Sequence, residues 1–279
     1  MPELPEVETI IRDLKNSRFR KNKITDIKID WPKTVKTHSV KEFQDELIGE
    51  HFTGFNRRAK YLIFRLSIDK TLIMHLRMSG KLIFHEKDTA VRKHDQVVFY
   101  FADGNQLHFN DTRKFGRMYL TEEPELILGK LGPEPLDGEF KANEFRDKLK
   151  NRSRMIKSLL LDQTFIAGLG NIYTDEALWE AGIHPEQSAN LISKNKQKKL
   201  YNAIKKVLRQ GIKNKGTSLG SGMGNYARTD KKMGDNRKAL KVYQRDGEPC
   251  PRCGHKIKKI KVAQRSSHYC SNCQRQRHK

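Results

Sequence analysis

The chain has 279 residues and carries 56 Lys and Arg against 33 Asp and Glu, giving a formal net charge of +23 and a pI near 9.9. That length suffices for two domains with separate cores. No apolar stretch approaches the ~20 residues of a membrane span, and the charged N-terminus lacks the apolar region of a signal peptide, which predicts a soluble cytoplasmic protein. The positive charge is spread along the whole chain. It favours nucleic acid as a partner over general solubility, because self-repulsion of this size destabilises a fold that has no polyanion to offset it.

The chain opens with MPELPEVETI, and residues 5–18 are predicted to form a helix with one apolar stripe. Pro5 suits the first helical position, and Glu6 suits the first turn, where a negative charge meets the positive end of the helix dipole. Pro2, which Glu3 follows directly, has no helical explanation.

Between about residues 23 and 121 the sequence contains short β-type runs separated by turn signals such as ADGN. Six or more such runs predict a β-sandwich or flattened barrel with the first helix packed on it. Lys60 is predicted to lie in the middle of a strand, where a lysine normally faces solvent. Arg113 and Phe115 lie two residues apart at a strand end, on the same side of an extended chain. Such a pair suits the space left by an extruded base, although Phe115 alone would be assigned to the core.

The segment LGPEPL at 131–136 is predicted to end the β-rich part, because two prolines disfavour regular structure. Helices are predicted over 141–150, 154–163, 171–181 and 193–214, and the lysines of the last one are assigned mainly to its solvated face. Between two of these helices lies IAGLGNIY, where Asn171 is predicted to cap the next helix. Exposed backbone N–H groups there can bind a DNA phosphate or simply allow close packing. The glycine-rich stretch 214–238 is predicted to be a functional or disordered loop.

All four cysteines lie in the last thirty residues, in CPRC at 250–253 and CSNC at 270–273. Two C-x2-C pairs separated by sixteen residues predict a four-thiolate zinc site with a hairpin between the pairs. Disulfides and a thioredoxin-like redox pair are the alternatives. The lack of a signal peptide disfavours the first, and the lack of a surrounding βαβ pattern disfavours the second. His255 and His268 lie nearby, but four thiolates already complete a structural site.

Taken in order, the segments MPELPEVET, RRAKYL, HLRMSG, KHD, DTRKFG, AGLGNIY, AGIHP and AQRSSHYC resemble the formamidopyrimidine-DNA glycosylase family. The resemblance implies a multidomain α+β fold with DNA in the cleft between domains. A catalytic β-sandwich with the N-terminal helix is expected over 1–132, a helix-two-turn-helix domain over 133–237 with a mobile loop at about 216–236, and a zinc-finger module over 238–279. The implied activity is base-excision repair: removal of 8-oxoguanine and formamidopyrimidines, followed by lyase cleavage of the abasic site.

The resemblance also implies a mechanism that begins at the N-terminus. Removal of Met1 would free the secondary amine of Pro2, which matches the family's nucleophile. A terminal amine has a pKa of ~8, so an appreciable fraction is neutral near pH 7 and able to attack C1′ of the sugar. The resulting iminium permits β- and then δ-elimination of the two phosphates. Glu3 matches the acid that protonates the opening sugar ring, and Glu6 matches a structural and catalytic helper.

The remaining matches concern DNA and metal. Lys60 matches a lysine of proton transfer and phosphate contact, and Arg265 matches the zinc-finger arginine that grips phosphates and assists the second elimination. The positions matched to DNA contacts are His94, Arg152, Lys157 and Asn171, and those matched to the trio inserted where the base leaves are Met78, Arg113 and Phe115. One structural Zn²⁺ is expected on Cys250, Cys253, Cys270 and Cys273. The expected partner of this monomer is double-stranded DNA with oxidised bases or abasic sites, bound at the nucleoid in the cytoplasm without membrane contact.

Two other functions stay open. Endonuclease VIII, which acts on oxidised pyrimidines, shares the implied fold, but its family typically opens with a PEGPE pattern, and both PELPEVET and the Arg113–Phe115 pair favour the purine enzyme. A non-catalytic zinc-ribbon protein that binds nucleic acid would need only the charge and the cysteines. The combination of Pro2, Glu3 and Lys60 disfavours that reading.

Overall fold

The structure is a computed structural model that describes residues 1–17, 21–87, 89–220 and 226–276. It divides into two compact units, which are described separately. The first comprises Met1–Lys130 and Asn214–Arg237, and the second comprises Leu131–Lys213 and Lys238–Lys279. By its contacts, the segment 214–237 therefore belongs with the N-terminal unit, and the zinc module belongs with the helices. The expected division into three domains stays a prediction.

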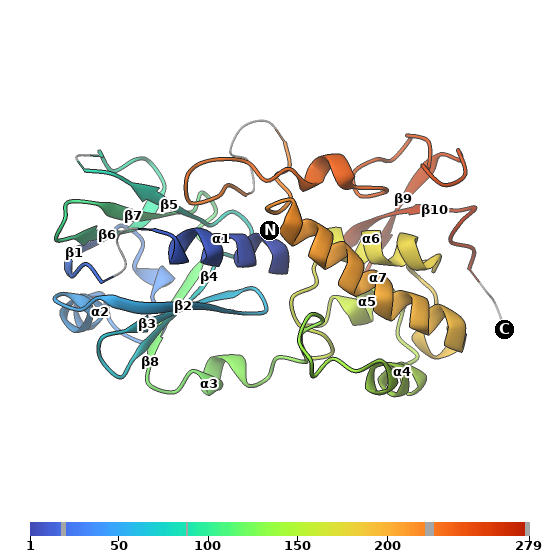
Figure 1. Cartoon of the computed structure of the whole chain (residues 1–279), viewed down its shortest axis with the longest axis horizontal. Coiled ribbons are helices and arrows are strands. Elements are labelled where there is room, and N and C mark those ends of the chain that lie inside the picture. Colours follow the sequence, from blue (N-terminus) through green and yellow to red (C-terminus); the bar gives the residue numbers. More distant parts are fainter. Residues whose placement is uncertain (18–20, 88, 221–225, 277–279) are drawn as a thin grey trace. The chain divides into compact units, whose positions relative to one another are not determined.

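Two antiparallel four-stranded sheets form the body of the first unit, which is therefore a β-sandwich as predicted (Figure 1). One sheet has the strand order β2-β3-β4-β8, and the other has the order β1-β6-β7-β5. The strands are β1 (Ile24–Ile29), β2 (Phe52–Arg58), β3 (Tyr61–Leu66), β4 (Thr71–His75), β5 (Lys81–His85), β6 (Asp95–Phe101), β7 (Gln106–Asn110) and β8 (Arg117–Thr121).

The core of this unit unites both sheets around aromatic rings. The Phe52 ring of β2 lies 5.3 Å from that of Phe64 on β3 and 6.2 and 6.1 Å from those of Phe99 and Phe101 on β6. All four side chains are buried, and burying one such ring stabilises the fold by roughly 1.5–3 kcal/mol. The packing of rings from different strands thus fixes the sandwich that carries the connecting turns.

Helix α1 (Leu4–Lys15) packs its apolar stripe into this core, as predicted. It begins one residue earlier than expected, so that Pro5 occupies the second helical position, because Glu3 and Glu6 form a capping box ahead of it. The expected end at residue 18 lies outside the described residues. Helix α2 (Val40–Leu47), the short α3 (Glu125–Leu128) and the 3₁₀ turn η1 (Pro32–Thr34) were not predicted.

Lys60 does not lie in a strand, contrary to the prediction. The apolar run at 51–66 breaks into β2 and β3 because Ala59 adopts a left-handed conformation with φ of 52°, and Lys60 completes the turn between them. The alternation of apolar residues continues on both sides of this break, which hides it in the sequence pattern.

The second unit contains the four predicted helical segments and the hairpin. The helices are α4 (Ala142–Lys150), α5 (Ile156–Leu160), α6 (Asn171–Ala181) and α7 (Lys194–Lys213), with the 3₁₀ turn η2 (Ala189–Leu191), and the strands of the hairpin are β9 (Ile257–Val262) and β10 (Arg265–Cys270). The 3₁₀ turn η3 (Asn236–Ala239) includes the last two residues of the first unit and the first two of the segment that returns to the second. Helices α6 and α7 pack closely because Gly211 leaves room for the Tyr173 ring; a Cβ at Gly211 would lie 2.5 Å from the tyrosine hydroxyl. Among the described residues, no helix is both long and apolar enough to cross a membrane.

Candidate active site and nucleic-acid interface

Four of the residues predicted to meet DNA gather at one end of the sandwich because of the strand pairing. The chain passes from one sheet to the other three times, once in the long connection 30–51 and twice in the short connections 76–80 and 111–116. The last residue of β4 pairs with the first of β8, and the first residues of β5 and β6 both pair with the last of β7. The turns that carry Met78, His94, Arg113 and Phe115 therefore lie together.

The side chains on these turns are presented to solvent. Met78 and Phe115 are 40% and 43% exposed, among large apolar residues that are otherwise mostly buried. The Arg113 guanidinium carbon lies 4.8 Å from the centre of the Phe115 ring, within cation–π range. The segment is not extended, since Lys114 between the two residues is left-handed with φ of 57°. The turn nonetheless brings the two side chains together.

The N-terminal residues are held at the start of α1. Pro2 is buried, and the carboxylates of Glu3 and Glu6 are almost inaccessible. One oxygen of Glu6 accepts the backbone N–H of Glu3 at 2.8 Å, and the other accepts that of Thr217 at 2.7 Å. Glu6 thereby joins the N-terminus to the first part of the 216–236 segment. Residues 221–225 of that expected loop lie outside the described residues.

Lys60 lies at the same end of the sandwich as the turns of Met78 and Arg113, because the residue after it, Tyr61, pairs with His75 at the end of β4. The lysine is only 5% exposed. Burial, with the charges of Arg77 and Lys60, lowers the pKa of His75 to about 3. His75 is therefore a neutral ring at physiological pH, and its Nδ1 accepts the backbone N–H of Arg77 at 2.9 Å.

Helix α1 is tied directly to the Lys60 turn. The Arg57 guanidinium donates to the Glu8 carboxylate at 3.0 Å and to the carbonyl of Ala59 at 3.2 Å. Arg57 thus spans from the second turn of the helix to the backbone beside Lys60. This contact keeps the start of α1 and the lysine turn in one arrangement.

The second unit presents Arg265 at a sharp hairpin turn. The residue pairs with Val262 across a two-residue turn, Ala263 and Gln264, which have φ of 47° and 61°. Two successive left-handed residues match a type I′ turn, which normally prefers Asn-Gly. The Arg265 side chain is exposed at the first position of β10.

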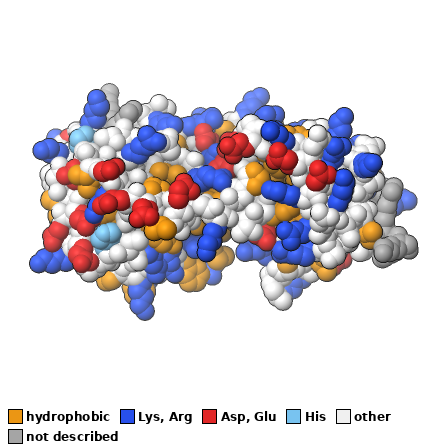
Figure 2. Space-filling view, turned by 90° about the horizontal axis from the view of Figure 1, so that it is seen from below, with side chains coloured by type: hydrophobic (Ala, Val, Ile, Leu, Met, Phe, Trp, Pro, Cys, Tyr) orange, Lys and Arg blue, Asp and Glu red, His pale blue; other side chains and the backbone are white. Residues whose placement is uncertain are grey.

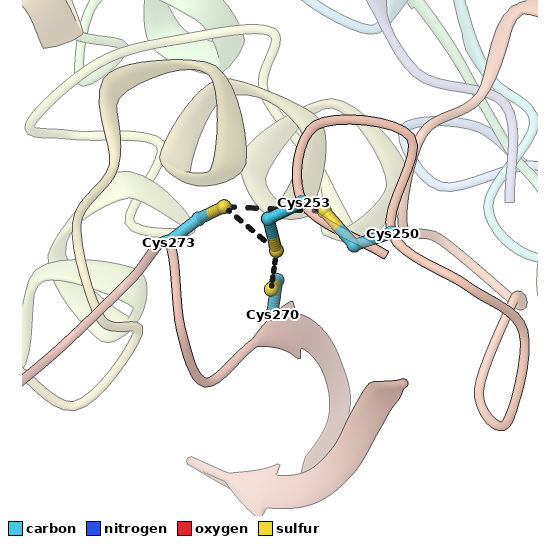
Figure 3. Close-up of side chains that lie close together, drawn as sticks. All are labelled: Cys250, Cys253, Cys270 and Cys273. Carbon is cyan, nitrogen blue, oxygen red and sulfur yellow. Dashed lines mark hydrogen bonds between the residues drawn. The ribbon is translucent and has the colours of Figure 1, made fainter. Parts of the chain in front are cut away.

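At the end of this hairpin opposite the turn, the four cysteines converge as predicted (Figure 3). Their sulfur atoms all lie within 4.8 Å of one another, and no disulfide joins them. The Sγ atoms of Cys253 and Cys270 are 3.4 Å apart, and those of Cys250 and Cys273 are 4.0 Å apart. A tetrahedron with Zn–S bonds of ~2.3 Å has S···S edges of roughly 3.8 Å, so the set fits one Zn²⁺. The Trp179 indole N–H points to Cys250 Sγ at 3.4 Å.

Lys157 is placed differently from what a DNA contact requires. Its side chain is fully buried, and its ammonium donates to Asp175 at 2.6 Å and to the carbonyl of Ser266 at 2.8 Å. The same carbonyl accepts the side-chain amide of Asn171 at 2.9 Å. Both residues therefore hold the hairpin next to Arg265, whereas Arg152 is exposed.

The glycine segment before α6 also differs in detail from expectation. Gly170, not Asn171, occupies the capping position, and Asn171 is the first helical residue. The N–H of Gly168 donates to the side chain of Gln163 at 3.0 Å, so this group is engaged within the protein. The glycines thus serve the turn, with Gly168 at φ of 95°.

Three buried carboxylates were not singled out from the sequence. Asp111 accepts hydrogen bonds from the turn carrying Arg113 and Phe115, and Asp175 accepts from Lys157 and from the backbone of His268 at 2.8 Å. Glu176 accepts the backbone N–H groups of residues 241–243 at 2.8–2.9 Å, although burial raises its pKa. The one available signal was an acidic pair inside the apolar pattern of α6.

Basic side chains occur along the whole face shown in Figure 2, interspersed with acidic ones. On this face the positive charge is thus spread along the molecule, in keeping with its distribution along the sequence.

Comparison with known proteins accounts for the whole chain. Residues 1–118 match the formamidopyrimidine-DNA glycosylase N-terminal domain, residues 131–223 match its H2TH domain, and residues 247–276 match the zinc finger found in FPG and IleRS. A formamidopyrimidine-DNA glycosylase of Protochlamydia amoebophila is 49% identical over 276 residues, which cover 99% of this chain and 100% of the relative. One from Desulfitobacterium hafniense is 45% identical, covering 93% of this chain and 94% of the relative.

Solved structures agree. A point mutant of the Lactococcus lactis FPG, in complex with DNA containing Fapy-dG, is 41% identical, with a TM-score of 0.91, covering 99% of this chain and 100% of that one. The Lactococcus lactis Fpg in complex with DNA containing an abasic site also reaches 41% identity and a TM-score of 0.91, covering 98% and 100%. With its three matched domains, its sandwich and its four-thiolate zinc site, the chain belongs to the formamidopyrimidine-DNA glycosylase family.

Proposed function

We propose that this DNA glycosylase removes oxidised purines, formamidopyrimidines and 8-oxoguanine, from duplex DNA and then cleaves the abasic site it leaves. The relatives carry the name of this activity, and the Lactococcus lactis protein was solved with DNA containing Fapy-dG and with abasic-site DNA. The net charge of +23 suits a duplex, whose phosphates release counterions when lysine and arginine bind them.

The observation that carries the proposal is the arrangement around Pro2. The residue directly precedes Glu3, the N-cap of α1, and Glu6 accepts the backbone N–H of Glu3. Once Met1 is removed, the nitrogen of Pro2 is a secondary amine with a lone pair. It attacks C1′ as the bond to the base breaks, the base leaves with the bonding electrons and takes a proton, and an iminium links Pro2 to the sugar.

Two side chains of the first unit suit the proton transfers. Glu3 is next to the nucleophile and is our candidate for protonating the ring oxygen as the sugar opens. The iminium acidifies C2′, and loss of that proton expels the 3′-phosphate. Lys60, held beside α1 through Arg57 and the Ala59 carbonyl, is our candidate for proton transfer and phosphate contact.

The DNA-binding roles divide between the units. In the first, Met78, Arg113 and Phe115 are proposed to occupy the gap left by the flipped nucleotide, and His94 to contact the backbone. In the second, Arg152, Asn171 and Arg265 are proposed to contact phosphates, with Arg265 also assisting the second elimination. Zn²⁺ supplies no chemistry to the reaction and keeps the hairpin folded.

The expected partner is double-stranded DNA, bound by a monomer. We propose a cytoplasmic location, since four thiolates that must stay reduced to hold zinc suit a reducing compartment.

The test is borohydride reduction during reaction with 8-oxoguanine paired with cytosine. A covalent protein–DNA adduct is expected, and Pro2→Gly or an N-terminal tag that retains an amide at Pro2 should reduce it at least 100-fold. Undiminished trapping with a blocked terminus would contradict the nucleophile assignment.

The lesion class is tested in parallel. Excision from 8-oxoguanine and formamidopyrimidine duplexes should exceed excision from thymine glycol. A strong preference for thymine glycol would instead assign the chain the specificity of endonuclease VIII; the Lactococcus lactis protein has been solved with DNA containing an oxidised pyrimidine, which makes this comparison necessary.

A further inference from the structure

The carboxylate of Asp111 organises the two turns that cross between the sheets. It is fully buried and directly follows β7. One oxygen accepts the backbone N–H groups of Phe115 at 2.9 Å and Gly116 at 2.8 Å. The other accepts that of Arg113 at 3.2 Å. The backbone on both sides of Lys114 is therefore bonded to a single side chain.

The same carboxylate reaches the turn of Met78. Ser79, the residue after Met78, donates its hydroxyl to Asp111 at 2.5 Å, and the Ser79 oxygen also accepts the backbone N–H of Arg113 at 3.2 Å. Ser79 is 7% exposed, so this bond is shielded from water. A hydrogen bond to an ionised acceptor is about twice as strong as one between neutral groups.

The backbone of Asp111 extends the connection to a third turn. Its N–H donates to the carbonyl of His94 at 2.9 Å, and its own carbonyl accepts the side chain of Gln96 at 3.0 Å. His94 is left-handed with φ of 77°. A non-glycine residue in that region needs surrounding contacts to hold it.

The Phe109 ring, two residues before Asp111, supports the two crossing turns from below. A Cβ at Gly80 would lie 2.9 Å from this ring, and one at Gly116 would lie 2.2 Å from it. Both glycines are therefore required for the turns to rest on the ring. Because both turns pack on the Phe109 ring and are hydrogen-bonded to the Asp111 carboxylate, they have little freedom to move independently.

We propose that Asp111, through Ser79, is a positioning residue that joins the Met78 turn and the Arg113–Phe115 turn into one rigid wedge for base extrusion. The inference rests on the proposed function, in which these side chains occupy the gap left by the flipped nucleotide. Extruding a base costs a few kcal/mol. Inserted side chains lower that cost only if they keep their positions while the neighbouring base pairs tend to restack into the gap. Asp111 touches no reacting atom in this role.

The experiment compares a reaction that needs extrusion of a damaged base with one that does not. Ser79→Ala removes the bond between the turns, and Asp111→Asn replaces one of the two acceptor oxygens with a donor. Single-turnover excision of 8-oxoguanine from a duplex should fall about 10-fold or more in both variants. Cleavage and borohydride trapping of a preformed abasic site should stay within about threefold of the unmodified protein.

Ser67→Ala is the matched control, since Ser67 also donates its hydroxyl to a carboxylate, Glu50, but near the turn between β3 and β4. It should leave both reactions unchanged. Thermal unfolding of each variant checks the fold, and 2-aminopurine fluorescence beside the lesion reports unstacking, which Ser79→Ala should slow.

Epistasis separates positioning from general stability. In a background with Met78→Ala, Arg113→Ala and Phe115→Ala, no wedge side chains are left to position, so adding Ser79→Ala should cost no further excision activity. An equal loss in both backgrounds, or equal losses on lesion and abasic DNA, would overturn the proposal. A failure of the proposed function would look different, because the unmodified protein would then neither excise the base nor form the trapped adduct.

Discussion

The two surfaces proposed to bind DNA are held in place by different kinds of interaction. In the first unit, the turns rest on an aromatic core shared by two sheets, and the buried groups beneath them are an anion bonded to backbone N–H groups and the neutral ring of His75. In the second, the hairpin rests on four thiolates, a small apolar cluster around Trp179 and Val242, and the fully buried Lys157–Asp175 pair. The first surface therefore depends on packing, whereas the second depends on a metal and on paired charges.

Removing zinc should show the largest difference in stability between the hairpin and the sandwich. A chelator is expected to unfold the hairpin and weaken DNA binding at least 100-fold, because the apolar cluster alone is too small to hold it. Hydrogen exchange should show loss of protection in 247–276 and little change in 24–121. Equal loss of protection in the sandwich would contradict the separation.

Lys157→Met tests the buried pair. It keeps the length of the side chain but leaves the Asp175 carboxylate buried without its cation, which should destabilise the second unit by about 3–5 kcal/mol. Chemical denaturation measures the loss, and adding Asp175→Leu should restore much of it. If Lys157 instead contacts DNA, the single variant will lose affinity and salt dependence at unchanged stability.

His75 makes the stability of the first unit depend on pH. Its pKa is about 3 in the fold, against ~6.5 in an unfolded chain, so the unfolded state binds more protons between these values. The contribution of His75 to the free energy of unfolding has its full value above about pH 6.5. It falls by up to about 1.4 kcal/mol per pH unit on acidification toward pH 3. His75→Asn keeps an oxygen that can accept the N–H of Arg77 but has no titrating ring. This variant should make the free energy of unfolding less dependent on pH. Parallel curves for the two proteins between pH 6.5 and 4.5 would contradict this.

The smallest effect is expected at the hairpin turn. Replacing Ala263 and Gln264 by Asn and Gly supplies the residues a type I′ turn prefers and should stabilise the zinc-bound hairpin by about 1 kcal/mol. Thermal unfolding of the zinc-loaded protein measures it. A lower midpoint would show that these side chains make contacts worth more than the strain they cause.

The sequence predicted the elements with regular periodicity and missed those set by long-range contacts. The apolar stripe of α1, the β-runs and the cysteine spacing each carry a local pattern, and the sandwich, the helices and the zinc site were confirmed. The position of Lys60 was wrong because the left-handed Ala59 interrupts a run whose alternation hides the break.

The candidate site shows the same limit. The sequence motifs identified Met78, Arg113 and Phe115. Their turns lie together because β4 pairs with β8 in one sheet and β5 pairs with β7 in the other, and no local sequence pattern encodes these pairings. Lys157 was matched to a DNA contact through the family resemblance, which carries no information on burial. Its burial depends on Asp175, eighteen residues away, and on the carbonyl of Ser266 in the hairpin.

The most direct measurement is to locate the crosslink after borohydride trapping on 8-oxoguanine DNA. Trypsin digestion followed by mass spectrometry should find the sugar remnant on the peptide Pro2–Arg12, attached to the proline nitrogen, with Met1 absent. Attachment to Lys60, or to any other lysine, with an unmodified N-terminal peptide would contradict the account.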